Sequence, residues 1–171
     1  MRPARPVYPK QPIVLALAVL VACSSPESAP VGVDRIVVEK SERRLILVSG
    51  NNAVRSFRIS LGGNPSGHKR QEGDERTPEG VYSISRRNAE SSFYRALQIS
   101  YPNAEDRAAA QESGVDPGGL IMIHGIRNGL GWVGKLHRLV DWTNGCIAVT
   151  NSEMDQIWES VKIETPVEIR P

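Results

Sequence analysis

Long hydrophobic runs and cysteine are both scarce in this chain. The most apolar stretch, residues 12–22, contains 11 residues, whereas a helix needs about 20 to span a bilayer. Only two cysteines occur among 171 residues, Cys23 directly after that stretch and Cys146 near the C-terminus. The first scarcity argues against a membrane-spanning helix at the N-terminus. The second leaves two thiols in unrelated surroundings, each of which needs its own explanation.

A large excess of charge of one sign is also missing. The chain has 21 basic and 19 acidic residues, a formal net charge of +2. Three of the basic residues (Arg2, Arg5 and Lys10) and none of the acidic ones lie in residues 1–22, so the remainder has a net charge of −1. We therefore expect no nucleic-acid partner and no basic patch for an anionic membrane surface.

Residues 1–22 have the make-up of a secretory signal peptide, with a positive segment followed by an apolar one. The apolar segment ends in Leu20-Val21-Ala22-Cys23, which resembles a bacterial lipobox. The resemblance implies cleavage before Cys23, a diacylglycerol on its thiol and acylation of the new N-terminus. Several acyl chains would make a stable membrane anchor. The alternative is an ordinary signal peptide that a cysteine follows by chance.

Residues 23–32 are rich in Ser and Pro and are expected to form a flexible polar tether. The expected location is the periplasmic face of the cell envelope, with the domain attached to a membrane through its lipid. Ser24 stands where an Asp marks inner-membrane retention in enteric bacteria, which favours the outer membrane.

Residues 33–171 are expected to form one domain, with no internal repeat and with enough length for a core of its own. Asn103 is expected to cap the first of two helices, Gly114 to end it, and Asn151 to cap the second. The fold class is therefore mostly β (α+β) with small helices. The expected strands are 35–39, 44–48, 53–60, 81–85, 96–100, 120–123 and 166–169, and the expected helices are 104–112 and 152–161.

Two long connections interrupt this pattern. Residues 62–80 form a polar loop with several glycines, and loops of this length in a compact domain are usually functional or mobile. We expect His68 within it to be solvated. Residues 126–141 are interpreted as a lid or substrate-shaping loop. Trp132 and Trp142 would be walls of a binding cleft or, equally, core residues.

Cys146 and His124 are the candidate nucleophile and base. A thiol attacks a carbonyl as thiolate and needs a base or a positive field nearby. Gly145 allows a sharp turn that could aim peptide N–H groups at a developing oxyanion. In the alternative interpretations Cys146 is a small buried hydrophobe and His124 a structural residue. A zinc site of His124, His137 and Cys146 is a further alternative, although the spacings match no standard zinc motif.

These motifs together resemble the L,D-transpeptidase catalytic domain, also called the YkuD domain. That family has His-Gly at the end of a strand and then Ser/Thr-x-Gly-Cys, and this chain has His124-Gly125 and residues 143–146, Thr-Asn-Gly-Cys. It also has Thr-Pro-x-Gly before a strand, here residues 77–80. The similarity extends over about residues 34–170 and implies a YkuD-type β-sandwich.

The resemblance also implies roles for individual residues. Cys146 would be the nucleophile and His124 the general base and later the acid. The N–H groups around Gly145 and Cys146 would form the oxyanion hole, and a main-chain carbonyl at the position of Thr143 would orient His124. The residues expected to contact the substrate are Gly125, His137, Trp142 and Asn144.

The implied substrate is a tetrapeptide stem of peptidoglycan. The thiolate would attack the carbonyl of the third residue, a diamino acid, and expel the terminal D-alanine. An amine from a second stem, giving a 3→3 cross-link, or from a lysine-bearing protein would then resolve the thioester, with no cofactor or metal. The alternatives are hydrolysis by an L,D-carboxypeptidase and a non-catalytic peptidoglycan-binding lipoprotein. Asn144 and Ala148, which replace the family's usual His and Arg or Asn, leave the choice of acceptor open.

Overall fold

The computed structural model describes residue 1 and residues 32–171. The predicted signal peptide, the lipidation of Cys23 and nearly all of the predicted tether therefore lie outside the described residues. Within those residues, no helix is both long enough and apolar enough to cross a membrane.

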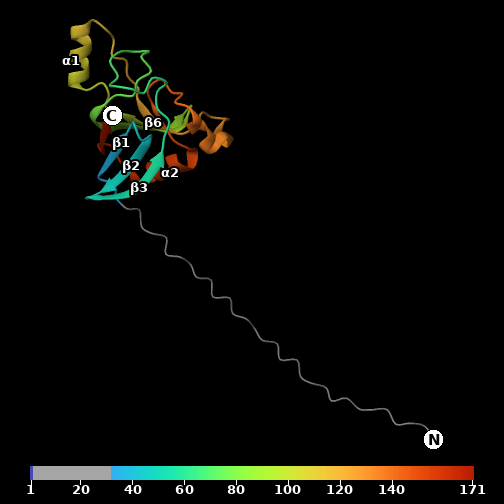
Figure 1. Cartoon of the computed structure of the whole chain (residues 1–171). Helices are drawn as coiled ribbons and strands as arrows, with labels where there is room; N and C mark the ends of the chain where they lie inside the picture. The colour runs from blue at the N-terminus through green and yellow to red at the C-terminus, as the bar shows by residue number, and fades with distance from the viewer. Residues whose placement is uncertain (2–31) are drawn as a thin grey trace.

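Eight strands form one mixed sheet in the order β3-β2-β1-β8-β4-β5-β6-β7 (Figure 1). The pairs β1–β8 and β6–β7 are parallel, and all other neighbours are antiparallel. A mostly β fold with small helices is thus confirmed. The strands are β1 (Arg35–Glu39), β2 (Arg44–Ser49), β3 (Asn52–Arg58), β4 (Gly80–Ser91), β5 (Tyr94–Ile99), β6 (Met122–His124), β7 (Ile147–Ala148) and β8 (Pro166–Arg170); the helices are α1 (Ala104–Ser113), the 3₁₀ segment η1 (Gly131–Leu139) and α2 (Asn151–Ser160).

Strand β4 belongs to both halves of the sheet. Its first part, Gly80 to Ser83, pairs with β8, and the part from Ile84 onward pairs with β5. Apolar side chains of both halves and of α2 meet in one core, because each strand turns alternate residues inward. The core includes Ile36, Leu45, Leu47, Ile84, Leu97, Ile99, Ile123, Ile147, Met154, Ile157, Val167 and Ile169.

The segment after β3 connects the two edges of the sheet. Ser60 forms an antiparallel bridge with Ala148, and Gly62 forms a parallel bridge with Thr143. Residues near one edge strand, β3, therefore touch β7 and the chain leading into it, at the other edge. The predicted strand 53–60 ends two residues earlier than expected, and β7 was not predicted because two residues carry no periodic signal.

The helix caps agree with the sequence at one helix and differ at the other. Asn103 caps α1 in a reciprocal capping box with Asp106, and Gly114 ends it in the left-handed conformation, as predicted. The predicted cap of α2, Asn151, is wrong. Thr150 is the N-cap, because its hydroxyl accepts the N–H of Glu153 while the Glu153 carboxylate accepts the N–H of Thr150.

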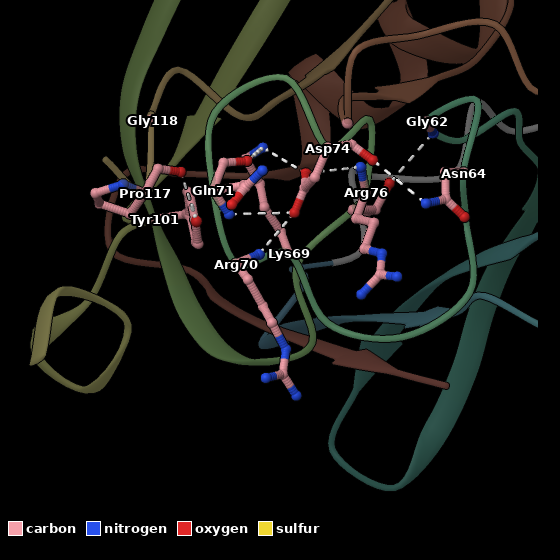
Figure 2. A network of polar contacts seen from close by, with 12 residues as sticks. Gly62, Asn64, Lys69, Arg70, Gln71, Asp74, Arg76, Tyr101, Pro117 and Gly118 are labelled. Atoms are coloured by element: carbon pink, nitrogen blue, oxygen red, sulfur yellow. Dashed lines mark hydrogen bonds and ion pairs between the residues drawn. The ribbon is translucent and has the colours of Figure 1, made fainter. Parts of the chain in front are cut away.

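Loop 62–80 is fixed at its centre by the Asp74 carboxylate (Figure 2). One oxygen accepts the N–H groups of Arg70 at 2.7 Å and Gln71 at 3.2 Å, and the other accepts the Lys69 ammonium at 2.9 Å and the Arg76 N–H at 3.0 Å. Burial by itself raises the pKa of this carboxyl, but the four donors outweigh burial and lower the pKa to about 2.

Further contacts attach the loop to the domain. The buried Lys40 ammonium donates to the Thr77 carbonyl at 2.9 Å and to the Glu79 carboxylate at 2.8 Å. His68 is not fully solvated, contrary to the prediction. Its Nδ1 accepts the Glu79 N–H at 3.0 Å, and its Nε2 lies 3.1 Å from the Asp106 carboxylate.

Asp74→Asn is expected to lower the free energy of unfolding at pH 7 by about 2 kcal/mol. The folded-state pKa of about 2 lies below the ordinary value of 3.8, so the carboxylate stabilises the fold above pH 4 and loses this effect as pH falls toward 2. Urea titrations of both proteins between pH 7 and pH 2 measure the difference. Parallel stability curves for the two proteins across this range would contradict the assignment.

Candidate active site

A cleft of about 420 Å³ lies at the β6–β7 edge of the sheet. His124 is the last residue of β6, and Cys146 immediately precedes β7. The parallel register sets His124 beside Ala148, and side chains two positions apart share a face of a sheet, so the imidazole and the thiol reach the same side. The lining residues are Asn88, Ser91, Ser92, Phe93, Leu120, Met122, His124, Trp142, Thr143, Asn144 and Cys146.

The His124 imidazole is buried and oriented. Its Nδ1 donates to the Gly125 carbonyl at 2.6 Å, which leaves Nε2 as the basic nitrogen. Its ring packs against Phe93, with centroids 4.7 Å apart, and against Trp142, with centroids 5.9 Å apart. Burial lowers the pKa of His124, and the bond to Gly125 only partly opposes this effect, so the ring is neutral at pH 7.

The carbonyl that orients His124 is therefore that of Gly125 and not that of Thr143. The Thr143 carbonyl accepts the N–H of Gly63 at 3.0 Å instead. This bond belongs to the bridge between the segment after β3 and the turn before Cys146. The Thr143 carbonyl is the one that the family resemblance predicted would orient His124.

The Cys146 thiol is half-buried and in contact with the edge of β6. It donates to the Leu120 carbonyl, with Sγ 3.6 Å from the oxygen. Burial raises the pKa of the thiol, while the N–H of Met122 and the positive charge of Lys69 act in the opposite direction and are outweighed. The thiol is thus protonated at rest, and it needs a neutral base such as His124 in order to react.

The turn before Cys146 is rigid. Gly145 has φ +113°, and a Cβ there would lie 2.5 Å from the Arg76 carbonyl oxygen, so only glycine fits. The Thr143 hydroxyl donates to the Cys146 carbonyl at 2.7 Å and accepts the Gly145 N–H at 3.2 Å. Because the Gly145 N–H is already bonded, the Cys146 N–H is the better candidate for an oxyanion donor.

Of the residues predicted to contact the substrate, some line the cleft and others do not. Asn144 and Trp142 line the cleft, and Gly125 supplies the carbonyl described above. His137 does not line it: the residue is 7% exposed, and its Nδ1 lies 3.4 Å from the indole nitrogen of Trp142, which it supports from behind. Trp132 is neither a wall nor a core residue, because it is 80% exposed.

The zinc alternative finds no support in the geometry. Burial, followed by the charge of Arg138, lowers the pKa of His137 to about 4, but this histidine does not reach the cleft that holds His124 and Cys146. Across residues 32–171, no group of three His, Cys, Asp or Glu side chains is placed to hold a metal ion.

Asn151, which the sequence predicted as a helix cap and as a possible stand-in for the polar group missing at Ala148, supports the turn beside His124. Its Oδ1 accepts the N–H of Ile126 at 2.8 Å. A Cβ on Gly125 would lie 2.7 Å from that oxygen, and a Cβ on Gly131 would lie 2.8 Å from the Asn151 Nδ2. The side-chain amide therefore fills the space between two glycines and fixes the turn that carries the His124-orienting carbonyl.

No sequence signal predicted the wall formed by the end of β4 and the turn that follows it. Asn88, Ser92 and Phe93 line the cleft but belong to no motif, and they lie more than 30 residues before the His124 motif. They reach the site because the turn between β4 and β5 lies close to β6. Strand β5 pairs with β6, and this pairing sets Ala96 beside His124.

The chain belongs to the L,D-transpeptidase catalytic domain family, the YkuD family, whose model matches residues 33–169. The sheet, the three short helices and the two motifs at the cleft agree with this membership.

Relatives of known name or structure are longer than this chain. YafK of Escherichia coli strain K12, provisionally described as an L,D-transpeptidase, is 33% identical over 108 residues, which cover 62% of this chain and 36% of YafK. A variant of the helical cell shape determining protein Pgp2 from Campylobacter jejuni matches with a TM-score of 0.65 and 27% identity over 81% of this chain and 47% of Pgp2. An L,D-transpeptidase from Mycobacterium smegmatis, at 11% identity and a TM-score of 0.54, covers 82% of this chain and 60% of its own and shares the fold.

Asn151→Ala is expected to slow alkylation of Cys146 by iodoacetamide at pH 7 about tenfold, a barrier increase of roughly 1.4 kcal/mol. Without the amide the turn at Gly125 relaxes, and His124 is no longer aimed at the thiol. The rate is followed by intact mass between pH 5 and 9. Asn64→Ala, an exposed asparagine in loop 62–80, is the matched control and should react like the unmodified protein. An Asn151→Ala profile that coincides with that control would refute the role.

Proposed function

We propose that this protein is a cysteine acyltransferase that acts on the tetrapeptide stems of peptidoglycan. The observation that supports it is the pairing, in one cleft, of a protonated thiol with a neutral imidazole whose Nδ1 is bonded to Gly125. The free Nε2 of His124 is then the general base, and the half-buried Cys146 is the nucleophile.

The proposed reaction has two stages. His124 Nε2 takes the Cys146 proton, and Sγ attacks the carbonyl of the third stem residue. The Cys146 N–H stabilises the oxyanion. Collapse breaks the peptide bond, the departing D-alanine amine takes the proton from His124, and a thioester remains. An acceptor then attacks the thioester and gives a proton to His124, and this proton restores the thiol.

Either an amine or water can be the acceptor, and the cleft lining bears on this choice. With His124 neutral, the lining residues of the described cleft include no charged side chain. No carboxylate is therefore placed there to hold an incoming ammonium group, so 3→3 cross-linking or attachment to a protein lysine would rely on other contacts. The uncharged lining therefore supports a second candidate function, an L,D-carboxypeptidase in which water is the acceptor. A contribution to cell shape, the role named for Pgp2, is part of the proposal in either case.

A carbapenem-type acylating probe tests the nucleophile. The unmodified protein should gain one adduct mass, Cys146→Ala none, and His124→Gln should react roughly 10²–10⁴-fold more slowly. The rate should fall as pH drops through the pKa of His124, which burial places below the ordinary value of 6.5. Thermal melts of the three proteins confirm that each is folded.

Muropeptide analysis after incubation with peptidoglycan identifies the acceptor. Release of D-alanine with new 3→3 dimers indicates transfer to an amine, and release without dimers indicates hydrolysis. Products that are the same for the unmodified protein and Cys146→Ala, together with no adduct, would leave only a non-catalytic wall-binding protein.

We also propose that Cys23 is the site of a lipid anchor at the periplasmic face of the cell envelope. The supporting observation is the sequence Leu-Val-Ala-Cys directly after an apolar segment. Cells fed an alkyne-labelled fatty acid should incorporate the label into this protein and not into Cys23→Ser, which should move to the soluble fraction. Equal labelling of both proteins, or none of either, would contradict the anchor. Fractionation of inner and outer membranes then tests the expected outer-membrane location.

A further inference from the structure

Exposed large apolar side chains gather on one short segment beside the cleft. Within residues 32–171, only three such residues lie elsewhere: Val81, Leu120 and Ile163. The other five lie on η1 and its two flanks, in the orange part of Figure 1. We call them the η1 patch: Leu130, Trp132, Leu136, Leu139 and Val140. A concentration of this kind on a folded domain marks a surface that contacts something apolar.

The segment that carries the patch is firmly attached to the domain. His137 is the buried side chain of η1 and contacts Trp142 and Ser60. Arg138 forms an ion pair with Glu153 at the start of α2. The patch is therefore presented outward by a fixed support, with Trp132 80% and Leu139 79% exposed.

The charges around the patch are positive. No Asp or Glu occurs between Asp116 and Asp141, and both Arg127 and Lys135 are exposed. Two acidic side chains lie near the patch, and both already form ion pairs. Asp141, which follows the patch in the sequence, pairs with Arg43 at 2.8 Å, and Glu153 of α2 pairs with Arg138. Trp and Leu side chains beside free Lys and Arg are the composition of segments that lie in the interface of a lipid bilayer.

The chain outside the described residues supplies a second argument. A link of about ten residues separates Cys23 from the domain, and an extended chain spans at most about 3.5 Å per residue. If Cys23 carries lipid, the domain stays within roughly 35 Å of the bilayer, and one of its faces is always close to it. The η1 patch is the apolar face available for this contact.

We propose that the η1 patch inserts into the headgroup region of a lipid bilayer, so that the active-site cleft opens beside the membrane surface. The patch is small, so its affinity is weak alone, and a lipid tether would raise its effective concentration at the surface. The near-zero net charge predicts no basic patch for an anionic membrane surface. That expectation concerned total charge, whereas the patch binds through apolar area and two local cations.

The test uses the full chain with Cys23→Ser, so that no lipid is attached, and vesicles with and without anionic lipid. Leu136→Ser combined with Leu139→Ser should weaken co-sedimentation with anionic vesicles about tenfold. Zwitterionic vesicles should bind the unsubstituted patch less well, because they offer Arg127 and Lys135 no anionic headgroups. Val81→Ser combined with Ile163→Ser removes exposed apolar residues elsewhere and should change nothing.

A local readout separates the patch from the N-terminal segment. Lipids brominated on the acyl chain should quench tryptophan fluorescence, and Trp132→Phe should remove the quenched component, since Trp132 is 80% exposed whereas Trp142 and Trp158 are half-buried. Equal sedimentation of the patch and control variants, with no Trp132-dependent quenching, would overturn the proposal. Loss of a concentration-dependent dimer in the patch variant, with unchanged vesicle binding, would also overturn it and assign the patch to a second copy of the chain. Cys146→Ala should bind vesicles as strongly as the unsubstituted protein, because the patch does not involve the thiol, so this result is independent of the proposed reaction.

Discussion

The parallel pairing of β6 with β7 is the constraint on which the site depends. It sets His124 beside Ala148 and thereby brings the imidazole and the Cys146 thiol to one face. Parallel neighbours cannot be joined by a tight hairpin and need a connection of a dozen or more residues. The crossover between His124 and Cys146, which includes η1, follows from this pairing. The segment η1 and its apolar patch are thus consequences of the same strand arrangement that brings His124 and Cys146 together.

Close backbone approach holds the cysteine loop in place. Gly62 and Gly145 leave room for the main chain at Glu75 and Arg76, which lies against them without an intervening side chain. Loop 62–80 can provide this support because its own interior is bonded around Asp74. A loop whose length and composition suggest a functional or mobile segment is therefore a rigid support for the turn before Cys146.

Burial, more than charge pairing, sets the protonation state of Cys146 and His124. It raises the pKa of Cys146 and lowers that of His124, so both groups are neutral at rest. Such a pair differs from a thiolate–imidazolium pair, because neither side chain carries a charge. The cleft lining likewise includes no charged side chain when His124 is neutral.

The sequence by itself determined the strands with clear alternation, the Asn103 cap and the family, because these depend on local periodicity or on adjacent residues. The catalytic roles of Cys146 and His124 stay a prediction, and the structure places both side chains in one cleft. The tertiary structure decided what depends on partners distant in the chain. The Gly125 carbonyl and not that of Thr143 orients His124, because it is the one that the Nδ1–H of His124 reaches in the fold, at 2.6 Å. Asn151 fills the gap between two glycines and does not cap α2. Local patterns cannot encode these outcomes, because strand register and close packing assign each polar group a partner only when the sheet is complete.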